Sequence, residues 1–388
     1  MDLQKDFPQS WWPIASFTSV GAIAETLRTT RPPGFYGNRD LINMSTSKLE
    51  FLDHSNNDWQ TFAATQEPAN IFHHTAWSRL MQECYGYRPF IVILRDAHGN
   101  ICAGLPMMEV NSKIARRRWV SLPFSDHCAP LSCDSTALGK FAEELTFKAH
   151  EPGTPKMELR WALPAQSEIQ SSAEYVLHTV QLGSALEKAA ERIHHSHRRN
   201  IKTAQTHGVQ IKIGRSLEDV QAFYSLHLQT RRRQGVPIQP YRYFELLHKR
   251  LIEQGLGFVL LAYEDGRCLA GAVFLHWSQT LTYKYGASTS EDLHLRPNHL
   301  IFWSAIRWGC DNGFTSLDLG RTSIDNNGLR DFKSRWGAQE IPLIYTRLAC
   351  EPKQAPNGHL LEMMHVIIRK SPAWVCRLSG EILYKHFG

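Results

Sequence analysis

The second half of this 388-residue sequence places a carboxylate close to a basic residue at the end of a predicted strand. Asp318 lies at the end of the predicted strand 314–319, shortly before Gly320 and Arg321. A carboxylate at the end of a strand can take a proton from an attacking amine, so Asp318 is a candidate catalytic base. Arg321 is a candidate ligand for an anionic group, because guanidinium suits phosphate and carboxylate. An ion pair between these residues, or a cap on the following turn, explains the same pattern.

A run of arginines precedes Gly235, where a helix is predicted to end, and Tyr241 follows this helix break. The helix dipole is enough to explain one or two cations at the end of a helix. Consecutive arginines beside such a break favour a loop that closes on an anionic substrate. The candidate substrate-binding residues of this region are Arg231, Arg232, Arg233 and Tyr241.

A second basic group, Arg198 and Arg199, lies on a predicted helix that also carries Arg192 and Lys202. Clustered cations on one helix face can neutralise the phosphates of a polyanion. A solvated helix face has the same composition, and the sequence alone does not separate the two interpretations.

Tyr283, Lys284 and Tyr285 follow one another in a predicted strand. Because successive side chains of a strand point to opposite faces, we expect the two tyrosines on one face and Lys284 on the other. Paired tyrosines most often belong to a core. A tyrosine hydroxyl can also act as an acid toward a leaving group, so Tyr285 is a candidate catalytic residue and Tyr283 a candidate binding residue.

The first half offers one polar pair, Asp126 and His127, directly after the segment 118–124. These residues are able to line a cleft for an acceptor. A polar turn is the simpler interpretation of the same two residues.

Hydrophobic periodicity predicts the elements that must position the second-half residues. A helix is expected from a capping box at Ser184 to a C-cap at Gly208, and a second capping box at Ser216 and Asp219 begins the next helix. The expected strands are 209–213, 258–263, 269–277, 281–286, 314–319 and 341–348. The other expected helices are 216–232, 241–254, 297–311 and 329–335.

The first half repeats this element order more faintly. Its expected strands are 49–52, 90–94, 101–108, 118–122, 157–161 and 175–182, and its expected helices are 58–65, 75–83 and 137–149. We therefore divide the chain into an extension (1–46), a first domain (47–183), a second domain (184–349) and a tail (350–388). The division rests on pattern, because no residue-level repeat is visible.

Composition sets outer limits on the function. Lys plus Arg exceed Asp plus Glu by 43 − 37 = 6, a mild excess that permits an anionic partner such as RNA or a membrane surface. The eight cysteines form no CxxC pair, and the clustered His194, His195 and His197 lack further ligands, so we expect no metal site. No apolar run reaches the roughly 20 residues of a membrane span, which makes a cytoplasmic location the default expectation.

Several motifs resemble the FemABX family, whose members are peptidoglycan aminoacyl transferases built from two GNAT-like domains. The motifs are Arg296-Pro297-Asn298-His299-Leu300, Asp318-Leu319-Gly320, Gly328-Leu329-x-x-Phe332-Lys333-x-x-Trp336-Gly337-Ala338 and, in the first half, Cys84-Tyr85-Gly86 and Ser121-Leu122-Pro123-Phe124. The resemblance covers about residues 49–348. It is greatest to FemAB-related proteins of exopolysaccharide and PEP-CTERM/exosortase loci.

The resemblance implies an α/β fold of two tandem GNAT-like domains, each a mixed twisted sheet flanked by helices. It also implies an acyltransferase that acts on an amine of a cell-envelope or exopolysaccharide precursor. A scaffold that only binds an anionic glycolipid remains the alternative from another class.

Lys333 is the residue to which the resemblance assigns catalysis, because the lysine of this Phe-Lys pair supports the reaction near the acyl donor in aminoacyl-transferring relatives. A fixed cation stabilises the negative charge that develops on the attacked carbonyl oxygen. The spacing of Leu329, Phe332 and Trp336 predicts a helix face that anchors the segment, with Lys333 free to reach a cleft. A surface lysine is the alternative. Phe332 is a candidate donor-binding residue.

The expected donor is an aminoacyl-tRNA or an acyl-CoA, with no tightly bound cofactor. Ordinary acetyl-CoA-dependent GNATs hold pyrophosphate in a glycine-rich loop at a helix N-terminus. Here that place carries Arg296, Pro297 and Asn298 without glycine, and proline removes one amide. We therefore expect weak acetyl-CoA binding and include Arg296 and Asn298 as candidate donor ligands. An ordinary N-acetyltransferase stays an alternative.

The tail from Gly358 to Gly388 alternates apolar residues such as Trp374 with basic residues such as Arg377. Basic amphipathic helices with an aromatic anchor lie on anionic membranes. The expected acceptor is an amine-bearing saccharide or peptide, and a lipid-linked form of it fits a peripheral contact at the inner face of the membrane. Packing against the second domain explains the same pattern.

Overall fold

The computed structural model describes residues 48–111, 117–164, 170–183, 185–349 and 365–386. The expected N-terminal extension and residues 350–364 of the tail lie outside these ranges. Within the described residues, no helix is both long and apolar enough to cross a membrane.

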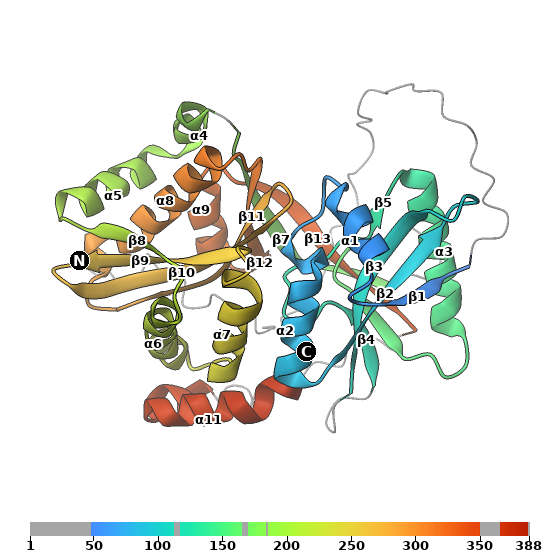
Figure 1. The fold of residues 1–388 in the computed structure, drawn as a ribbon. Helices are drawn as coiled ribbons and strands as arrows, with labels where there is room; N and C mark the ends of the chain where they lie inside the picture. The colour runs from blue at the N-terminus through green and yellow to red at the C-terminus, as the bar shows by residue number, and fades with distance from the viewer. Residues whose placement is uncertain (1–47, 112–116, 165–169, 184, 350–364, 387–388) are drawn as a thin grey trace.

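Residues 48–164 form an antiparallel ladder that ends in a parallel pair, β4 with β6 (Figure 1). The strands are β1 (Glu50–Asp53), β2 (Arg88–Arg95), β3 (Ile101–Val110), β4 (Arg118–Ser121), β5 (Leu131–Ser132) and β6 (Lys156–Leu159). The helices are α1 (Asn57–Ala64), the short η2 (Ile71–His73), α2 (Thr75–Tyr85) and α3 (Ser135–His150).

Residues 185–334 repeat this plan, again with a terminal parallel pair, β11 with β12. The strands are β8 (Gln210–Gly214), β9 (Gly257–Glu264), β10 (Arg267–Trp277), β11 (Thr280–Ser288) and β12 (Ser316–Ser323). The helices are α4 (Leu186–Arg192), α5 (His195–Thr206), α6 (Leu217–Gln234), α7 (Tyr241–Leu247), η3 (His248–Ile252), η4 (Leu293–Leu295), α8 (Pro297–Asp311) and α9 (Asn327–Ser334). The repeated plan confirms the tandem GNAT-like fold class.

Two long strands, β7 (Gln170–Gln181) and β13 (Gln339–Leu348), join the halves. β13 pairs with β7 along most of its length, and its last residues, from Thr346 to Leu348, pair with β6. β7 also pairs with β12, so one hydrogen-bonded sheet runs from β1 to β8. The sequence assigned 175–182 to the sheet of the first half, and this assignment is wrong. The two halves therefore share strands instead of carrying separate sheets.

The local signals in the sequence correspond closely to the helices. Ser216 and Asp219 form the predicted capping box of α6, and α8 begins at Pro297 as expected. The single helix predicted from Ser184 to Gly208 is instead split into α4 and α5. The amide of His194 donates to the carbonyl of Arg335, 2.9 Å away, so a contact with the end of α9 interrupts the helix.

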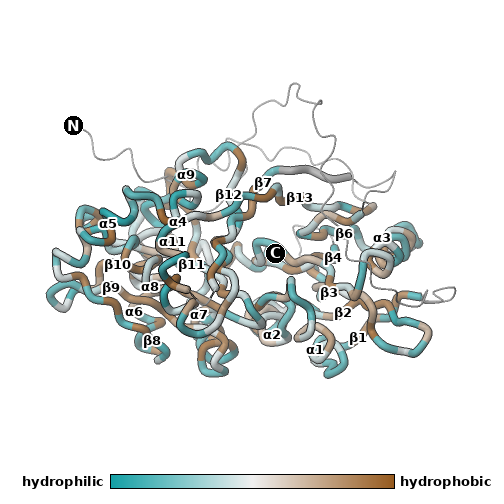
Figure 2. Tube along the Cα trace, turned by 90° about the horizontal axis from the view of Figure 1, so that it is seen from above, coloured by the Kyte–Doolittle hydropathy of each residue, from teal (hydrophilic) through white to brown (hydrophobic). Residues whose placement is uncertain are grey.

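The core lies on both faces of the sheet. One cluster extends from α2 and α3 to α6 and α7, so it continues from the first half into the second. The other fills the space between the second half of the sheet and α5, α8 and α9. In Figure 2, hydrophobic stretches follow β9 and β10, which are buried along most of their length.

The tail continues this packing. Residues 365–370 are helical, and α11 (Ala373–Leu383) with η5 (Tyr384–His386) follows. Figure 1 shows α11 along the outer edge of the molecule, beyond α6 and α7. α11 packs against α6.

Candidate active site

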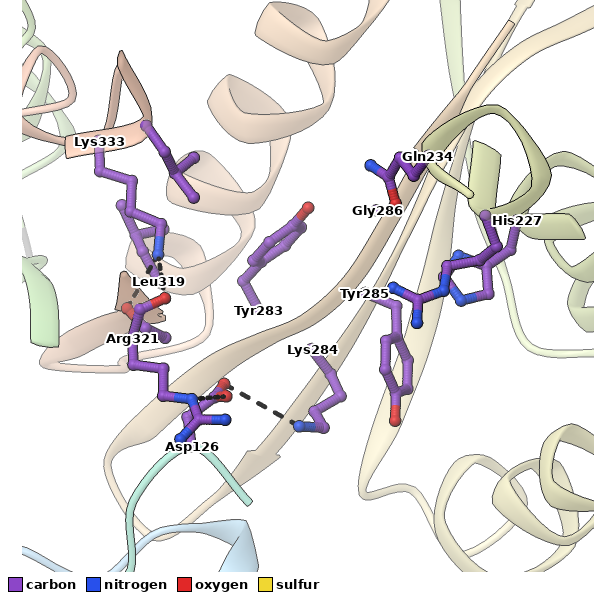
Figure 3. A pocket seen from close by; sticks show the side chains of 13 residues that line it. Asp126, His227, Gln234, Tyr283, Lys284, Tyr285, Gly286, Leu319, Arg321 and Lys333 are labelled. Carbon is purple, nitrogen blue, oxygen red and sulfur yellow. Dashed lines mark hydrogen bonds and ion pairs between the residues drawn. The ribbon is translucent and has the colours of Figure 1, made fainter. Parts of the chain in front are cut away.

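A pocket opens where β11 and β12 part. Their parallel pairing ends at Thr282 and Asp318, and the residues that follow on each strand line the space between them (Figure 3). The lining consists of Tyr283, Lys284, Tyr285 and Gly286 from β11, Leu319, Gly320 and Arg321 from β12, Leu329 and Lys333 from α9, His227, Arg231 and Gln234 from α6, and Asp126 from the first half. The pocket therefore combines both halves of the chain.

Lys333 is buried in this pocket. Its Nζ donates to the carbonyl oxygens of Gly320 at 2.9 Å and Arg321 at 3.1 Å. Leu329 in α9 and the fully buried Trp336 in the turn after it anchor the segment, and burial of a side chain such as leucine contributes roughly 1.5–3 kcal/mol. Phe332, predicted on the same face, is only partly buried. Lys333 is thus neither a surface lysine nor a freely moving one.

Burial lowers the pKa of Lys333 to about 8, although the carboxylates of Asp126 and Asp318 partly oppose this shift. The ammonium group is therefore held in a site where its charged and neutral forms are close in free energy. Such a perturbed group in a pocket is typical of functional sites.

Asp126 supplies a carboxylate to the pocket, contrary to its interpretation as part of a simple turn. Its Oδ2 lies 3.9 Å from Lys284 Nζ and its Oδ1 lies 3.7 Å from Arg321 Nε. Burial raises the pKa of Asp126, but the neighbouring cations Lys284, Arg321 and Lys333 outweigh it and leave the pKa below its usual value. Gly320 makes room for this approach, because a Cβ there would lie 2.7 Å from Asp126 Oδ2.

Lys284 was not among the predicted site residues. Its Nζ donates to the carbonyl of Phe124 at 2.7 Å and lies over the rings of Phe72, Trp77 and Tyr285 at 5.3–5.4 Å. Burial lowers the pKa of Lys284, and Asp126 opposes this shift. The sequence carried a signal that could have identified Lys284, because a lysine inside an otherwise apolar strand is unusual.

Tyr283 and Tyr285 do not share a face. Val273 pairs with Tyr285 while the next residue of β10, Phe274, pairs with Tyr283, so Lys284 forms a β-bulge. The two rings consequently enter different core clusters and point in different directions in Figure 3. The expectation from simple strand alternation is wrong here.

The Tyr285 hydroxyl donates to the Tyr243 hydroxyl at 2.9 Å, and burial raises its pKa. Burial likewise holds the pKa of Tyr283 well above its ordinary value. Both hydroxyls therefore stay protonated at neutral pH. Both residues line the pocket, as predicted, although their catalytic and binding roles remain predictions.

Asp318 lies beside the pocket and does not line it. Its Oδ1 accepts the amide of Gly320 at 2.7 Å, and its Oδ2 lies 2.9 Å from His127 Nε2. The cap on the following turn, one of the predicted alternatives, is therefore present. The other predicted alternative was an ion pair between Asp318 and Arg321. The Arg321 guanidinium instead donates to the Tyr345 hydroxyl at 2.6 Å and stacks on Tyr175.

Of the three consecutive arginines, Arg231 alone reaches this pocket. It donates to the carbonyl of Pro237 at 3.0 Å and to the Tyr384 hydroxyl at 3.1 Å. Arg232 instead donates to the carbonyl of Ser371 at 2.7 Å, and Arg233 donates to that of Ser288 at 3.1 Å. The arginines that were expected to face a substrate therefore make hydrogen bonds with the tail and with β11.

The remaining candidates lie elsewhere. Arg198 and Arg199 are exposed on α5, and the Tyr241 hydroxyl accepts a hydrogen bond from Gln221 at 2.8 Å. Phe332 packs in an aromatic cluster with His197, His299, Phe302 and Trp336. Arg296 and Asn298 stand at the start of α8 and are half-buried. None of these residues lines the pocket between β11 and β12.

Within the part of the chain that the structure describes, no group of His, Cys, Asp or Glu side chains is placed to hold a metal ion. The cysteines of the described ranges are free thiols, and most are buried or half-buried.

Comparisons with known proteins agree with this architecture. Residues 191–334 match the acetyltransferase (GNAT) domain family. The lipid II:glycine glycyltransferase of Staphylococcus saprophyticus is 34% identical over 79 residues, and that of Staphylococcus aureus is 32% identical over 79 residues. Each match covers 19% of this chain and 19% of the relative. The chain thus matches about a fifth of the length of these relatives.

Solved structures show the fold over a longer range. The crystal structure of FemX has a TM-score of 0.61 and 13% identity, covering 81% of this chain and 100% of that one. The C-terminal domain of a putative lysylphosphatidylglycerol synthetase from Agrobacterium fabrum has a TM-score of 0.50 and 13% identity, covering 80% and 94%. The fold and the matched segment define a GNAT-like architecture. Within this class, the chain is similar to proteins of the FemABX group, as the sequence motifs indicated.

Proposed function

We propose that this protein transfers an aminoacyl or other acyl group to an amine of a cell-envelope or exopolysaccharide precursor. The observation that carries the proposal is the pocket between β11 and β12, where the buried Lys333 lies against the backbone of β12. The similarity to proteins named lipid II:glycine glycyltransferase supports an aminoacyl group and a lipid-linked acceptor.

The chemistry of the pocket fits this reaction. Attack of an amine on an ester or thioester places negative charge on the carbonyl oxygen, which a preorganised cation stabilises. An ammonium group has three N–H donors, and two carbonyls occupy two of those of Lys333, so a third is available for that oxygen. Lys284 and Arg321 lie close to Asp126 in the same pocket, and the basic side chains of the lining outnumber this one carboxylate.

The donor in this proposal is an aminoacyl-tRNA or an acyl-CoA that does not depend on the usual pyrophosphate loop. Arg296 occupies the N-cap of α8 with a left-handed backbone and no side-chain cap, and Pro297 occupies the first turn. Proline has no amide to offer to a phosphate, which weakens this helix end as an anion site. This arrangement favours weak binding of acetyl-CoA.

The test is donor-dependent product formation. The purified 388-residue chain is incubated with radiolabelled aminoacyl-tRNA, a longer acyl-CoA or acetyl-CoA and with amine acceptors that include lipid II, and the labelled product is identified by mass spectrometry. We expect transfer from aminoacyl-tRNA or a longer acyl donor, and its loss in Lys333→Met. Efficient transfer from acetyl-CoA would instead indicate an ordinary N-acetyltransferase. Acceptor binding without transfer from any donor would support the non-catalytic scaffold.

A further inference from the structure

Helix α11 is apolar on two faces. Cys376 and Gly380 are buried against the segment after α6: the Cys376 thiol donates to the carbonyl of Val236 at 3.3 Å, and Gly380 leaves no space for a Cβ beside Ile238. A surface helix normally has one such face, which it turns toward the core. The buried face of α11 therefore packs against the core of the protein.

The second apolar face is exposed. Trp374, Leu378 and Ile382 follow one another at intervals of four residues, and they are 64%, 51% and 54% exposed. This interval places them on one side of the helix, away from Cys376 and Gly380. In the preceding helical residues 365–370, Val366 and Ile367 are each 52% exposed and add to the exposed apolar side chains of the tail.

Basic side chains outnumber acidic ones in this part of the tail. Arg369, Lys370 and Lys385 are exposed, and the Arg377 guanidinium lies 5.7 Å from the centroid of the Tyr241 ring, whereas Glu381 is the single acidic residue between 365 and 386. Exposed apolar side chains that include tryptophan, with cations beside them, are the composition of helices that lie in the interface of an anionic bilayer. The excess of positive charge argues for a lipid surface with acidic headgroups and against a second copy of this equally basic helix.

We propose that the outer face of the tail, formed by Val366, Ile367, Trp374, Leu378 and Ile382, docks on an anionic lipid surface. The contact goes beyond acyl transfer, because it concerns where the protein works. It also has a consequence for the pocket. Arg231, which lines the pocket, donates to the hydroxyl of Tyr384, directly after α11, so docking brings the pocket close to the bilayer.

Vesicle sedimentation tests the proposal with the full chain. One set of vesicles contains phosphatidylcholine alone, and a second set also contains phosphatidylglycerol. We expect binding to the second set that weakens when salt rises from about 0.1 M to about 1 M, because the screening length falls from about 10 Å to about 3 Å. The triple variant Trp374→Ser, Leu378→Ser, Ile382→Ser should bind at least about tenfold more weakly, because its apolar contacts with lipid are lost.

Phe147→Ser is the matched control, because Phe147 is 70% exposed on α3, in the first half. Several results would overturn the proposal: no binding to either vesicle, equal binding to both, or the same loss in the control. A dimer in solution that the triple variant dissociates would assign the face to a second copy instead. Acyl transfer to a water-soluble amine, measured in parallel, separates failure of docking from failure of the proposed function.

Discussion

His127 Nε2 lies 2.9 Å from Asp318 Oδ2, and this contact connects the segment after β4 with the strand that forms one wall of the pocket. Both side chains are buried. Because Asp318 also accepts the amide of Gly320, the contact fixes the backbone that holds Lys333. The two halves of the chain are thereby positioned relative to each other at the candidate active site.

Replacing His127 by alanine should lower the free energy of unfolding by about 1–3 kcal/mol, because Asp318 loses a partner in a buried site. Urea titration followed by circular dichroism measures the change. His98→Ala is the control, since His98 is exposed in a turn and should change stability by less than about 0.5 kcal/mol. Equal effects of the two variants would show that the contact contributes nothing specific.

Lys333→Met should lower turnover by about 100- to 1000-fold, the usual effect of removing one preorganised group from an oxyanion site. The variant keeps much of the side-chain volume and removes the charge. Turnover is measured beside a melting curve, once the donor and acceptor are known. Near-normal turnover in a folded Lys333→Met protein would remove Lys333 from the mechanism.

The pKa of about 8 for Lys333 gives the reaction a pH signature. Turnover that depends on the ammonium form should fall by about tenfold for each pH unit above about 8, because the cation is lost. In Lys333→Arg the charge persists above pH 12, so the remaining activity should not show this fall. Identical pH profiles would contradict the assignment.

The same shift affects stability. An exposed lysine has a pKa of 10.5, so between pH 8 and 10.5 the unfolded chain binds more protons at Lys333 than the folded chain does. The contribution of this residue to the free energy of unfolding therefore rises with pH across that window. Wild-type protein should gain stability relative to Lys333→Met between these pH values, measured by urea titration at each pH. A constant difference would place the pKa elsewhere.

Arg231 and Arg232 should behave differently although they are adjacent. Arg231→Gln should raise KM for an anionic substrate, more strongly at low salt, because Arg231 lines the pocket. Arg232→Gln should mainly lower the melting temperature, because it loses the hydrogen bond to Ser371 that holds the tail. Steady-state kinetics and melting curves of both variants test the distinction, and matching changes in KM would refute it.

Gly286→Ala should destabilise the pocket, since a Cβ at this position would overlap the hydroxyl of the buried Tyr283. Tyr283→Phe removes that oxygen and leaves the ring carbon Cζ at 3.1 Å, so the double variant should recover part of the stability. A double-mutant cycle of unfolding free energies measures this recovery. Simple additivity of the two changes in unfolding free energy would show that the contact between position 286 and the Tyr283 hydroxyl does not cause the destabilisation.

The order of helices and strands was predictable because its signals are local. The capping box of Ser216 and Asp219 and the proline at position 297 lie within the elements that they begin. The spacing of Leu329 and Trp336 likewise identified two buried anchors of the segment that contains α9. Hydrophobic periodicity depends only on neighbouring residues, so it predicts helices and strands without knowledge of the tertiary fold.

The composition of the pocket was less predictable because it depends on long-range packing. Asp126 and Lys333 meet in one pocket although 207 positions separate them (333 − 126). The bulge at Lys284 reverses the face of Tyr283, and no local pattern marks it. The arginines near 232 form a cationic run in sequence, but only the fold decides that the tail engages Arg231 and Arg232 while β11 engages Arg233.

The shared strand β13 has a consequence for biosynthesis. Among the described residues, β6 pairs on this side with Thr346–Leu348, which are synthesised nearly 190 residues later (346 − 159 = 187). Until then the nascent first half exposes an unpaired strand edge, which is a site for association with other chains. Pairing over such a sequence distance is slow. A ribosome-bound chain that stops before residue 346 therefore cannot complete the sheet on which the pocket rests.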